Sequence, residues 1–245
     1  TRKTVTFGIG DQPANVDLLG IRIAQASPLF VASRGGLRAY SDGITFVQST
    51  LNDLNLVEVV AKGDVRVTAP RAITTDGGSA VRIKTSGDLR LLAGSGSIAS
   101  VTAPLVIEIG GALTSASAGG DLSIRQVGGD ITFDRIYSAG KSTLIATTGR
   151  VTQRLVGPGI VAEGIDIQSH DAIGDANRFI EVITEGDFEA DSSQGIYIRS
   201  TIDLAIKDIE SRGGDVTLDI GGDALIDRVY AEAGLVSIYS DGAIL

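Results

Sequence analysis

The chain has 245 residues with a formal net charge of −9, 43% hydrophobic but only 4% aromatic residues, 32 glycines, no cysteine and no methionine. The absence of cysteine excludes a disulfide framework and a cysteine metal site, and no apolar run is long enough to span a bilayer. Because an acidic surface repels nucleic acid and anionic membranes, we expect neither as a partner and no membrane insertion.

Charge is uneven along the chain. Residues 1–120 hold 11 Lys and Arg against 9 Asp and Glu, a net charge of +2, whereas residues 121–245 hold 10 against 21, a net charge of −11. Such an excess of one sign keeps a repetitive β protein soluble. Because even position 1 lacks a methionine, we expect the sequence to be a segment of a larger repetitive protein, with flanking coils covering its ends.

One stretch of the chain occurs twice. Residues 121–140 return with small changes as residues 215–234, and a recurring unit of this size is typical of stacked coils. Units that follow a glycine and open a short alternating run begin at Leu37, Asp64, Asp88, Asp121, Lys141, Ile165, Asp187, Asp215 and Leu235. Their lengths are 27, 24, 33, 20, 24, 22, 28 and 20 residues. We expect the shortest units to be bare coils and the longer ones to carry loop insertions.

Within the units, apolar residues alternate with polar ones, as a strand with one buried face requires. The pairs expected to face inward are Val65 and Val67, Leu89 and Leu91, Leu122 and Ile124, Ile165 and Ile167, Phe188 and Ala190, Ile196 and Ile198, Val216 and Leu218, and Val236 and Ile238. The neighbours expected to face outward are Arg66, Arg90, Ser123, Asp166, Glu189, Tyr197, Thr217 and Ser237. No long stretch has the spacing of a helix. The ambiguous region 51–60 ends in Val-Glu-Val-Val, which favours a strand.

Glycines mark the corners between these strands. A Gly-Asp step recurs at 63–64, 87–88, 120–121, 129–130, 186–187, 214–215 and 222–223. Tight turns often need a positive φ, which only glycine adopts at low cost, so we expect one turn chemistry to be reused at these corners.

Together these patterns predict an all-β fold, a parallel β-helix (β-solenoid) of about ten coils of roughly 20–25 residues. We expect one domain over residues 1–245, with a less regular entry segment at 1–36 and regular coils at 37–245. With neighbouring strands ~4.8 Å apart, the coils would form a rod on the order of 50 Å long. The competing folds are a propeller, whose blades take ~40–50 residues, and a sandwich, which has no reason to repeat.

The acidic half contains one candidate metal site. Strand periodicity places Asp187, Glu189 and Asp191 on one outward face, and Asp166 of the preceding coil and Asp219 of the following one could join the same strip. Clustered oxygen ligands are what Ca²⁺ requires, so Ca²⁺ is the one cofactor that the sequence offers. The alternative is a solvated acidic face, because no ligating loop of fixed spacing and no calcium β-roll nonapeptide is present.

No catalytic constellation is recognisable. The single histidine, His170, lies in a polar, turn-like segment, so triads based on histidine have at most one possible base. The matching motifs Asp-Arg-Ile-Tyr at 134–137 and Asp-Arg-Val-Tyr at 227–230 are expected to be structural and to occupy the same place in their coils. A glycosidase needs two acids ~5–9.5 Å apart, and 30 acidic residues make some such pair inevitable.

The steps of the form Gly-Asp-[Val/Leu/Ile]-x-[Val/Leu/Ile/Phe] at 63–67, 87–91, 120–124, 129–133 and 214–218 resemble the repeat regions of filamentous-haemagglutinin-type exoproteins and related giant bacterial adhesins. The resemblance covers roughly residues 37–245. It implies a right-handed β-helical shaft, exported to the bacterial cell surface, that supports or presents adhesive or toxic modules. Neither that family's amino-terminal secretion domain nor a carboxy-terminal toxin or anchor is visible, so its export route and receptor do not transfer.

The leading functional hypothesis is a non-catalytic structural or adhesive rod segment of a large bacterial surface or secreted protein. Its expected partner is a receptor or glycan on a host or neighbouring cell. One alternative is a polysaccharide-active β-helix enzyme, a lyase or hydrolase, that uses acids of the 163–191 region. The other is a calcium-stabilised solenoid segment.

Overall fold

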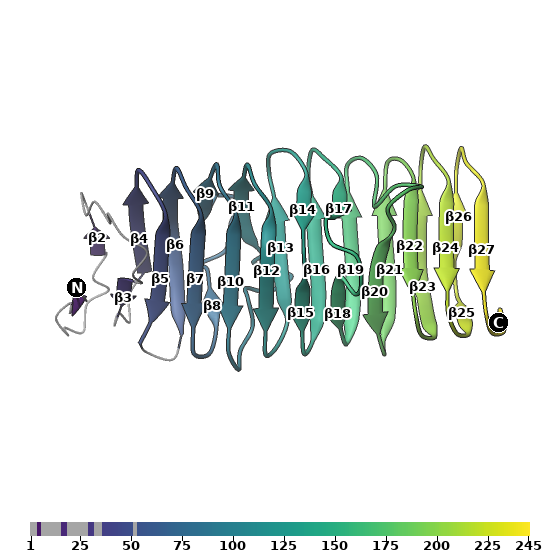
Figure 1. Cartoon of the computed structure of the whole chain (residues 1–245), viewed down its shortest axis with the longest axis horizontal. Coiled ribbons are helices and arrows are strands. Elements are labelled where there is room, and N and C mark those ends of the chain that lie inside the picture. Colours follow the sequence, from purple (N-terminus) through teal and green to yellow (C-terminus); the bar gives the residue numbers. More distant parts are fainter. Residues whose placement is uncertain (1–3, 6–15, 19–28, 32–35, 51–52) are drawn as a thin grey trace. The chain divides into compact units, whose positions relative to one another are not determined.

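The computed structural model describes residues 4–5, 16–18, 29–31, 36–50 and 53–245. They form an all-β solenoid of about 10 turns built from parallel sheets, with no helix in these ranges, which confirms the predicted fold class (Figure 1). The chain divides into two compact units, Thr1–Ile124 (unit 1) and Arg125–Leu245 (unit 2). Most of the entry segment expected at residues 1–36 lies outside the described residues.

Unit 1 winds between two parallel sheets. The strands of its first sheet are, in order, β1 (Thr4–Val5), β3 (Leu29–Val31), β5 (Thr45–Ser49), β7 (Val65–Ala69), β10 (Leu89–Ala93) and β12 (Leu113–Ala118). Those of its second sheet are β2 (Val16–Leu18), β4 (Gly36–Ser41), β6 (Leu54–Ala61), β9 (Ile83–Thr85), β11 (Leu105–Ile109) and β13 (Leu122–Gln126), with β8 (Ile73–Thr74) paired to β6.

Unit 2 repeats this construction. The strands of its first sheet are β15 (Ile136–Ser138), β18 (Ile160–Ala162), β20 (Ile180–Thr184), β22 (Ile196–Ser200), β24 (Val216–Ile220) and β27 (Val236–Ser240), together with the paired strands β14 (Ile131–Phe133) and β17 (Val151–Gln153). Those of its second sheet are β16 (Lys141–Ala146), β19 (Gly164–Ser169), β21 (Asp187–Ser192) and β23 (Leu204–Ser211), and β23 pairs with both β25 (Ala224–Ile226) and β26 (Val229–Ala231).

The core of each unit is a stack of aliphatic side chains in register. In unit 1, Val65 pairs with Leu89 and Val67 pairs with Leu91, and all four side chains are at most 1% exposed. Burial of an aliphatic side chain of this size contributes roughly 1.5–3 kcal/mol. The alternating pattern of the sequence therefore predicts the inward residues correctly here.

The sequence units are not all single turns. In unit 1, the unit that starts at Leu37 opens on the second sheet, those at Asp64 and Asp88 open on the first sheet, and that at Asp121 opens on the second. In unit 2, the starting strand likewise changes sheet between Asp187 and Asp215. The units of 27, 33 and 28 residues are therefore one and a half turns, so the prediction that loop insertions account for their length is wrong. It holds for the 24-residue unit that starts at Lys141, where six residues, 154–159, join β17 to β18.

A half-turn repeat explains this outcome. Within unit 2, the Gly-Asp step precedes strands of both sheets, since Gly186 leads into β21 of the second sheet and Gly214 leads into β24 of the first. The two sheets, which form the walls of the solenoid, thus have the same Gly-Asp corner and the same alternation of inward and outward residues. The sequence pattern returns every half turn, and the chain alone does not show which wall a given repeat occupies.

The Gly-Asp step is a connection between turns. In unit 1, the backbone N–H of Asp88 donates to Asp64 Oδ1 at 2.9 Å, and that of Ala112 donates to Asp88 Oδ1 at 2.8 Å. A Cβ added at Gly87 would lie 2.5 Å from Asp64 Oδ1 and 2.6 Å from Asp64 N. Glycine is required here by close approach of the preceding turn.

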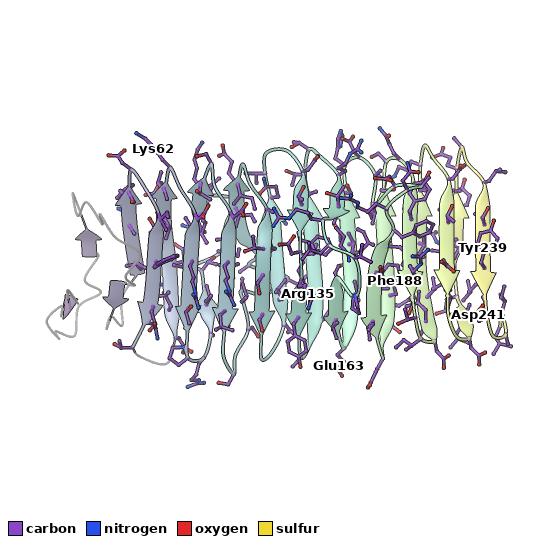
Figure 2. The ribbon with its side chains drawn as sticks, in the orientation of Figure 1. Lys62, Arg135, Glu163, Phe188, Tyr239 and Asp241 are labelled. Carbon is purple, nitrogen blue, oxygen red and sulfur yellow. The ribbon has the colours of Figure 1, made fainter. Side chains whose placement is uncertain are left out.

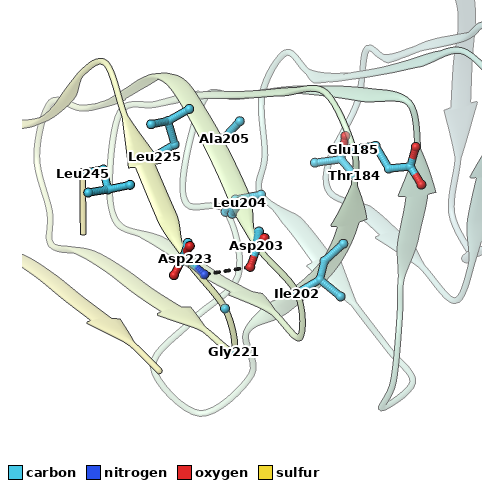
Figure 3. A pocket seen from close by; sticks show the side chains of 11 residues that line it. Thr184, Glu185, Ile202, Asp203, Leu204, Ala205, Gly221, Asp223, Leu225 and Leu245 are labelled. Atoms are coloured by element: carbon cyan, nitrogen blue, oxygen red, sulfur yellow. Dashed lines mark hydrogen bonds between the residues drawn. The ribbon is translucent and has the colours of Figure 1, made fainter. Parts of the chain in front are cut away.

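The expected turn chemistry is corrected by this geometry. Of the seven Gly-Asp steps given above, only that of Gly129 has a glycine with a positive φ, of 74°; a further Gly-Asp step in the described residues, at Gly174, has a φ of 68°. The same kind of hydrogen bond, which we call a rung, occurs in unit 2, where Asp223 N donates to Asp203 Oδ1 at 2.8 Å (Figure 3). The common feature of these corners is a row of aspartates whose Oδ1 atoms accept backbone N–H groups of the next turn, which we call the aspartate ladder. Most of the glycines beside the ladder do not have a positive φ.

Ser123 was expected to face solvent but is fully buried. Its strand β13 is next to β11, where the outward residue Val106 is also fully buried. Arg82 directly precedes β9, the strand that pairs with β11 on its other side. Its side chain is 8% exposed and donates from Nη2 to the carbonyl of Gly77 at 2.6 Å. A loop thus covers part of the outer wall of unit 1, so alternation predicts the side of the sheet correctly but not the exposure.

The two Asp-Arg-[Ile/Val]-Tyr motifs do not occupy equivalent places. Residues 134–137 link β14 to β15 of the first sheet of unit 2, whereas residues 227–230 link β25 to β26, which pair with β23 of the second sheet. Asp134 is 8% exposed and Asp227 is exposed. In both places the motif joins two consecutive strands of one sheet, so it interrupts a wall instead of turning a corner, and the half-turn repeat lets either wall carry it.

Candidate functional site

Three adjacent strands of the second sheet of unit 2 place acidic side chains in register. Asp166 on β19 pairs with Glu189 on β21, which pairs with Asp208 on β23. The next outward row pairs Asp191 with Glu210. These five acids, Gln168 and Ala190 line a shallow cavity of about 190 Å³, which we call the acidic groove.

Basic side chains accompany most acids of the groove. The ion pairs are Lys141 Nζ with Glu189 Oε2 at 3.6 Å, Lys207 Nζ with Glu189 Oε1 at 3.2 Å, Arg212 Nη2 with Asp191 Oδ2 at 2.8 Å, Arg228 Nε with Asp208 Oδ1 at 2.6 Å, and Arg228 Nη2 with Glu210 Oε2. Exposed pairs of this kind each contribute little to stability, because solvent screens them. Their effect is to neutralise the strip and to tie successive turns together.

Asp166 differs from the other acids of the groove. Desolvation by burial raises the pKa of its carboxyl above the ordinary value of 3.8, and the neighbouring charges of Glu189 and Asp191 act in the same direction. A hydrogen bond from Gln168 Nε2 to Asp166 Oδ1 at 3.3 Å and the charge of Lys141 oppose the rise. Because its pKa is raised, Asp166 keeps its proton to a higher pH than an ordinary aspartate does.

The structure brings together part of the predicted acidic strip. Asp187, Glu189 and Asp191 lie on β21 as predicted, and Asp166 is the register partner of Glu189. Asp219 is not part of the strip: it lies on β24 of the other sheet of unit 2, where Arg199 Nε donates to its Oδ2 at 2.7 Å. The 28-residue unit from 187 to 214 spans one and a half turns, which carries Asp219 to the opposite wall.

Sequence reasoning missed Asp208 and Glu210, which take the place expected for Asp219. The signal was present but interrupted: β23 has a register shift between the partners of Phe188 and Glu189, and this shift separates Ile206 from Ile209 by two outward residues. Strict period-two counting fails at such a bulge.

The acidic groove contains three of the four residues that were predicted to bind calcium: Asp166, Glu189 and Asp191. Over the described ranges, no group of three or more histidine, cysteine or acidic residues is placed to hold a metal ion. The calcium hypothesis for Asp187, Glu189, Asp191 and Asp166 therefore stays a prediction, with ion pairs as the observed arrangement. His170 is exposed at the bend after β19 and belongs to no such group of metal-binding residues within the described ranges.

A second cavity, which we call the arginine pocket, lies on the first sheet of unit 2. It has a volume of about 340 Å³ and is formed by the loops 154–159 and 174–179 and by the strands β20 and β22. Its lining residues are Arg154, Leu155, Val156, Ala176, Asn177, Arg178, Phe179, Glu181 and Arg199. Sequence analysis missed it, although three arginines spaced 24 and 21 residues apart within the acidic half were a usable signal.

The final turns of unit 2 enclose a third cavity, of about 690 Å³ (Figure 3). Its lining is mostly apolar and backbone, with Leu225 56% exposed and Leu245 69% exposed. The rung between Asp203 and Asp223 lies at its edge, as Figure 3 shows. These two aspartates serve the corner ladder, so the cavity offers contact area without a distinct reactive group.

Comparisons of the chain with protein-family models, with curated proteins and with solved structures found no match. Within the described ranges, no helix has the length and hydropathy needed to cross a bilayer.

Proposed function

We propose that the chain is a non-catalytic structural or adhesive segment of a large bacterial surface or secreted protein, similar to the filamentous-haemagglutinin-type exoproteins. The observation that supports this most directly is the use of polar side chains to join turns. Aspartates accept backbone amides of the next turn at the corners, and outward acids pair with cations along the walls. Side chains committed to such contacts stabilise a repetitive support and are poorly placed for chemistry.

The decisive experiment for this proposal compares location and adhesion. Antibodies against the chain should label intact bacteria that make the protein as strongly as permeabilised ones, and beads coated with the folded chain should adhere to cells or to immobilised glycans. Beads coated with heat-unfolded chain are the matched control. Labelling confined to permeabilised cells would contradict a surface role.

An enzyme acting on polysaccharides is the second candidate, and Asp166 is the observation that favours it. A carboxyl with a raised pKa beside an ionised partner is the arrangement of a general acid and a second carboxylate in glycosidases. Here Glu189 is the register partner of Asp166 within the acidic groove. However, Glu189 is ion-paired with Lys141 and Lys207, which favours the structural role.

Product release separates the two candidates. The chain is incubated with acidic and neutral polysaccharides, and new reducing ends and unsaturated products are measured. If the chain has a structural role, the unchanged chain should release no more product than the Asp166→Asn variant. Turnover by the unchanged chain that is lost in Asp166→Asn and Glu189→Gln would replace it with the enzyme hypothesis.

A further inference from the structure

The connections between turns explain the arginine pocket of unit 2 only in part: Arg154 and Arg199 join turns through ion pairs with aspartates, whereas Arg178 does not. Unit 2 holds 10 Lys and Arg against 20 Asp and Glu, yet three arginines and a single glutamate line this one cavity. A cavity whose charge opposes that of its surroundings directs an anionic group to one place. Because Arg154 is paired with Asp134 and Arg199 with Asp219, Arg178 is the guanidinium of the pocket that has no acidic partner among the described residues.

Two of these arginines differ in how many of their N–H donors are already used in hydrogen bonds. Arg199 Nε donates to Asp219 Oδ2 at 2.7 Å, and Arg199 Cζ lies 5.1 Å from the ring centroid of Phe179. A guanidinium has five N–H donors, so Arg199 is held in place and keeps donors for a ligand. The exposed Arg178 has no side-chain hydrogen bond or ion pair with any residue that the structure describes.

The loop 154–159 is held in shape before any ligand binds. The buried Gln153 donates from Nε2 to the carbonyls of Leu155 and Gly157, both at 2.6 Å, and its Oε1 accepts from Glu181 N at 2.8 Å. Gly157, with a φ of 94°, also donates from its backbone to Glu181 Oε1 at 3.1 Å. This wall of the pocket therefore needs little ordering on binding.

The opposite loop is equally defined. Asp175 and Arg178 exchange two backbone hydrogen bonds of 3.0 Å, and Asn177 N donates to Asp175 Oδ1 at 2.8 Å. The ring of Phe179 then meets that of Tyr197 edge to face, with centroids 6.0 Å apart. Arg178 is consequently presented from a closed turn beside an anchored ring.

The rim of the pocket is apolar. Val156 is 91% exposed and Leu155 is 47% exposed, both on the loop that also carries Arg154. A sugar site would present an open aromatic face, whereas the face of Phe179 is covered by Arg199. Aliphatic side chains next to guanidinium groups fit a ligand that carries a carboxylate and an apolar side chain close together.

We propose that the arginine pocket binds an acidic, partly apolar peptide segment of a partner protein. Arg178 and Arg199 bind its carboxylate, and Leu155 and Val156 contact the adjacent apolar side chain. Charge-assisted hydrogen bonds from guanidinium to carboxylate give such a site both strength and direction. The inference goes beyond the structural role and rests on the pocket alone, so either can fail without the other.

The test uses N-acetyl-leucine as the probe, because it joins one carboxylate to one aliphatic side chain. It is titrated into the full chain labelled with ¹⁵N, and the arginine Nε–H signals are followed. We expect saturable binding with a Kd on the order of 1–10 mM. The affinity should fall about tenfold in Arg178→Gln, as the loss of a charged hydrogen bond implies. The exposed Arg135, which Figure 2 labels, is not among the residues that line the pocket, and Arg135→Gln should bind as the unchanged chain does.

Three outcomes would overturn the proposal. In the first, the uncharged N-acetyl-leucinamide binds as tightly as N-acetyl-leucine. In the second, Arg135→Gln and Arg178→Gln lose the same affinity for N-acetyl-leucine. In the third, glucuronate binds more tightly than N-acetyl-leucine, which would identify a sugar site. Val156→Ser provides a second variant that leaves every charge in place, and it should weaken N-acetyl-leucine but not acetate. Thermal melts of each variant confirm that the fold is retained.

Discussion

Asp64 and Asp88 occupy the same corner of unit 1 in successive turns, and the backbone N–H of Asp88 donates to Asp64 Oδ1 across 2.9 Å. Asp88 in turn accepts, through its own Oδ1, the backbone N–H of Ala112 in the following turn at 2.8 Å. The repeated Gly-Asp step therefore reports how turns are joined. It carries no information about a ligand.

Gly87→Ala should destabilise the chain by roughly 1–3 kcal/mol, because the new Cβ would lie 2.5–2.7 Å from atoms of Gly63 and Asp64 that include backbone. Gly43→Ala is the control, since nothing lies within 4 Å of a Cβ built there. Denaturant unfolding monitored by circular dichroism measures both. Equal effects of the two substitutions would contradict the close-approach explanation.

Asp88→Ala should cost about 1 kcal/mol, because the backbone N–H of Ala112 loses the acceptor that Asp88 Oδ1 provides at 2.8 Å. Asp88→Asn keeps an oxygen in the same position and should recover most of the loss. The comparison of unfolding midpoints checks this. If Asn were as destabilising as Ala, the carboxylate charge rather than the hydrogen bond would be responsible.

Arg154→Gln should destabilise the chain by about 1–3 kcal/mol. Arg154 binds both oxygens of Asp134 at 2.6 Å, and Asp134 is 8% exposed, so the substitution leaves a mostly buried carboxylate without its cation. Lys62→Gln is the exposed counterpart: Lys62 pairs with Asp42 at 2.7 Å at a corner of unit 1 (Figure 2), and this substitution should destabilise the chain far less, because solvent screens the pair. Similar losses in both variants would show that burial of Asp134 is unimportant.

Asp166→Asn should stabilise the chain at neutral pH by up to about 0.5 kcal/mol. Because burial raises the pKa of Asp166 in the folded state, the ionised carboxylate opposes folding at neutral pH, and this effect disappears as the pH falls through the folded pKa to below 3.8. The difference between variant and parent should shrink to zero over that range. A difference that does not change with pH would contradict the desolvation argument.

Calcium at millimolar concentration should leave the melting temperature unchanged, since the described acids of the groove have basic partners or hydrogen bonds. The measurement is a thermal melt with calcium and with a chelator, because a ligand of the folded state must raise the midpoint. A clear rise with calcium would support the solenoid that binds calcium instead.

Much of the fold could be predicted from alternation alone. Val65, Leu89 and Ile167 are buried as their positions require, because a two-residue period needs no knowledge of distant parts of the chain. Ser123 escaped prediction because its burial depends on a wall that loops cover. The lengths of the units were misinterpreted because the two walls share one pattern.

The candidate sites were less accessible to prediction for the same reason. Glu189 and Asp166 could be placed side by side because one full turn separates their strands. Asp219 could not, because the intervening residues wind through an additional half turn. The arginine pocket depends on two loops and a ring contact between Phe179 and Tyr197, none of which leaves a periodic trace.

The half-turn repeat also bears on how such a chain changes during evolution. Because both walls accept the same corner, duplication or loss of a single strand-and-corner module leaves the core pattern intact while moving every later residue to the other side of the molecule. Recombination between neighbouring modules would thus relocate a surface loop, such as the one that carries Val156, without redesigning the interior that supports it.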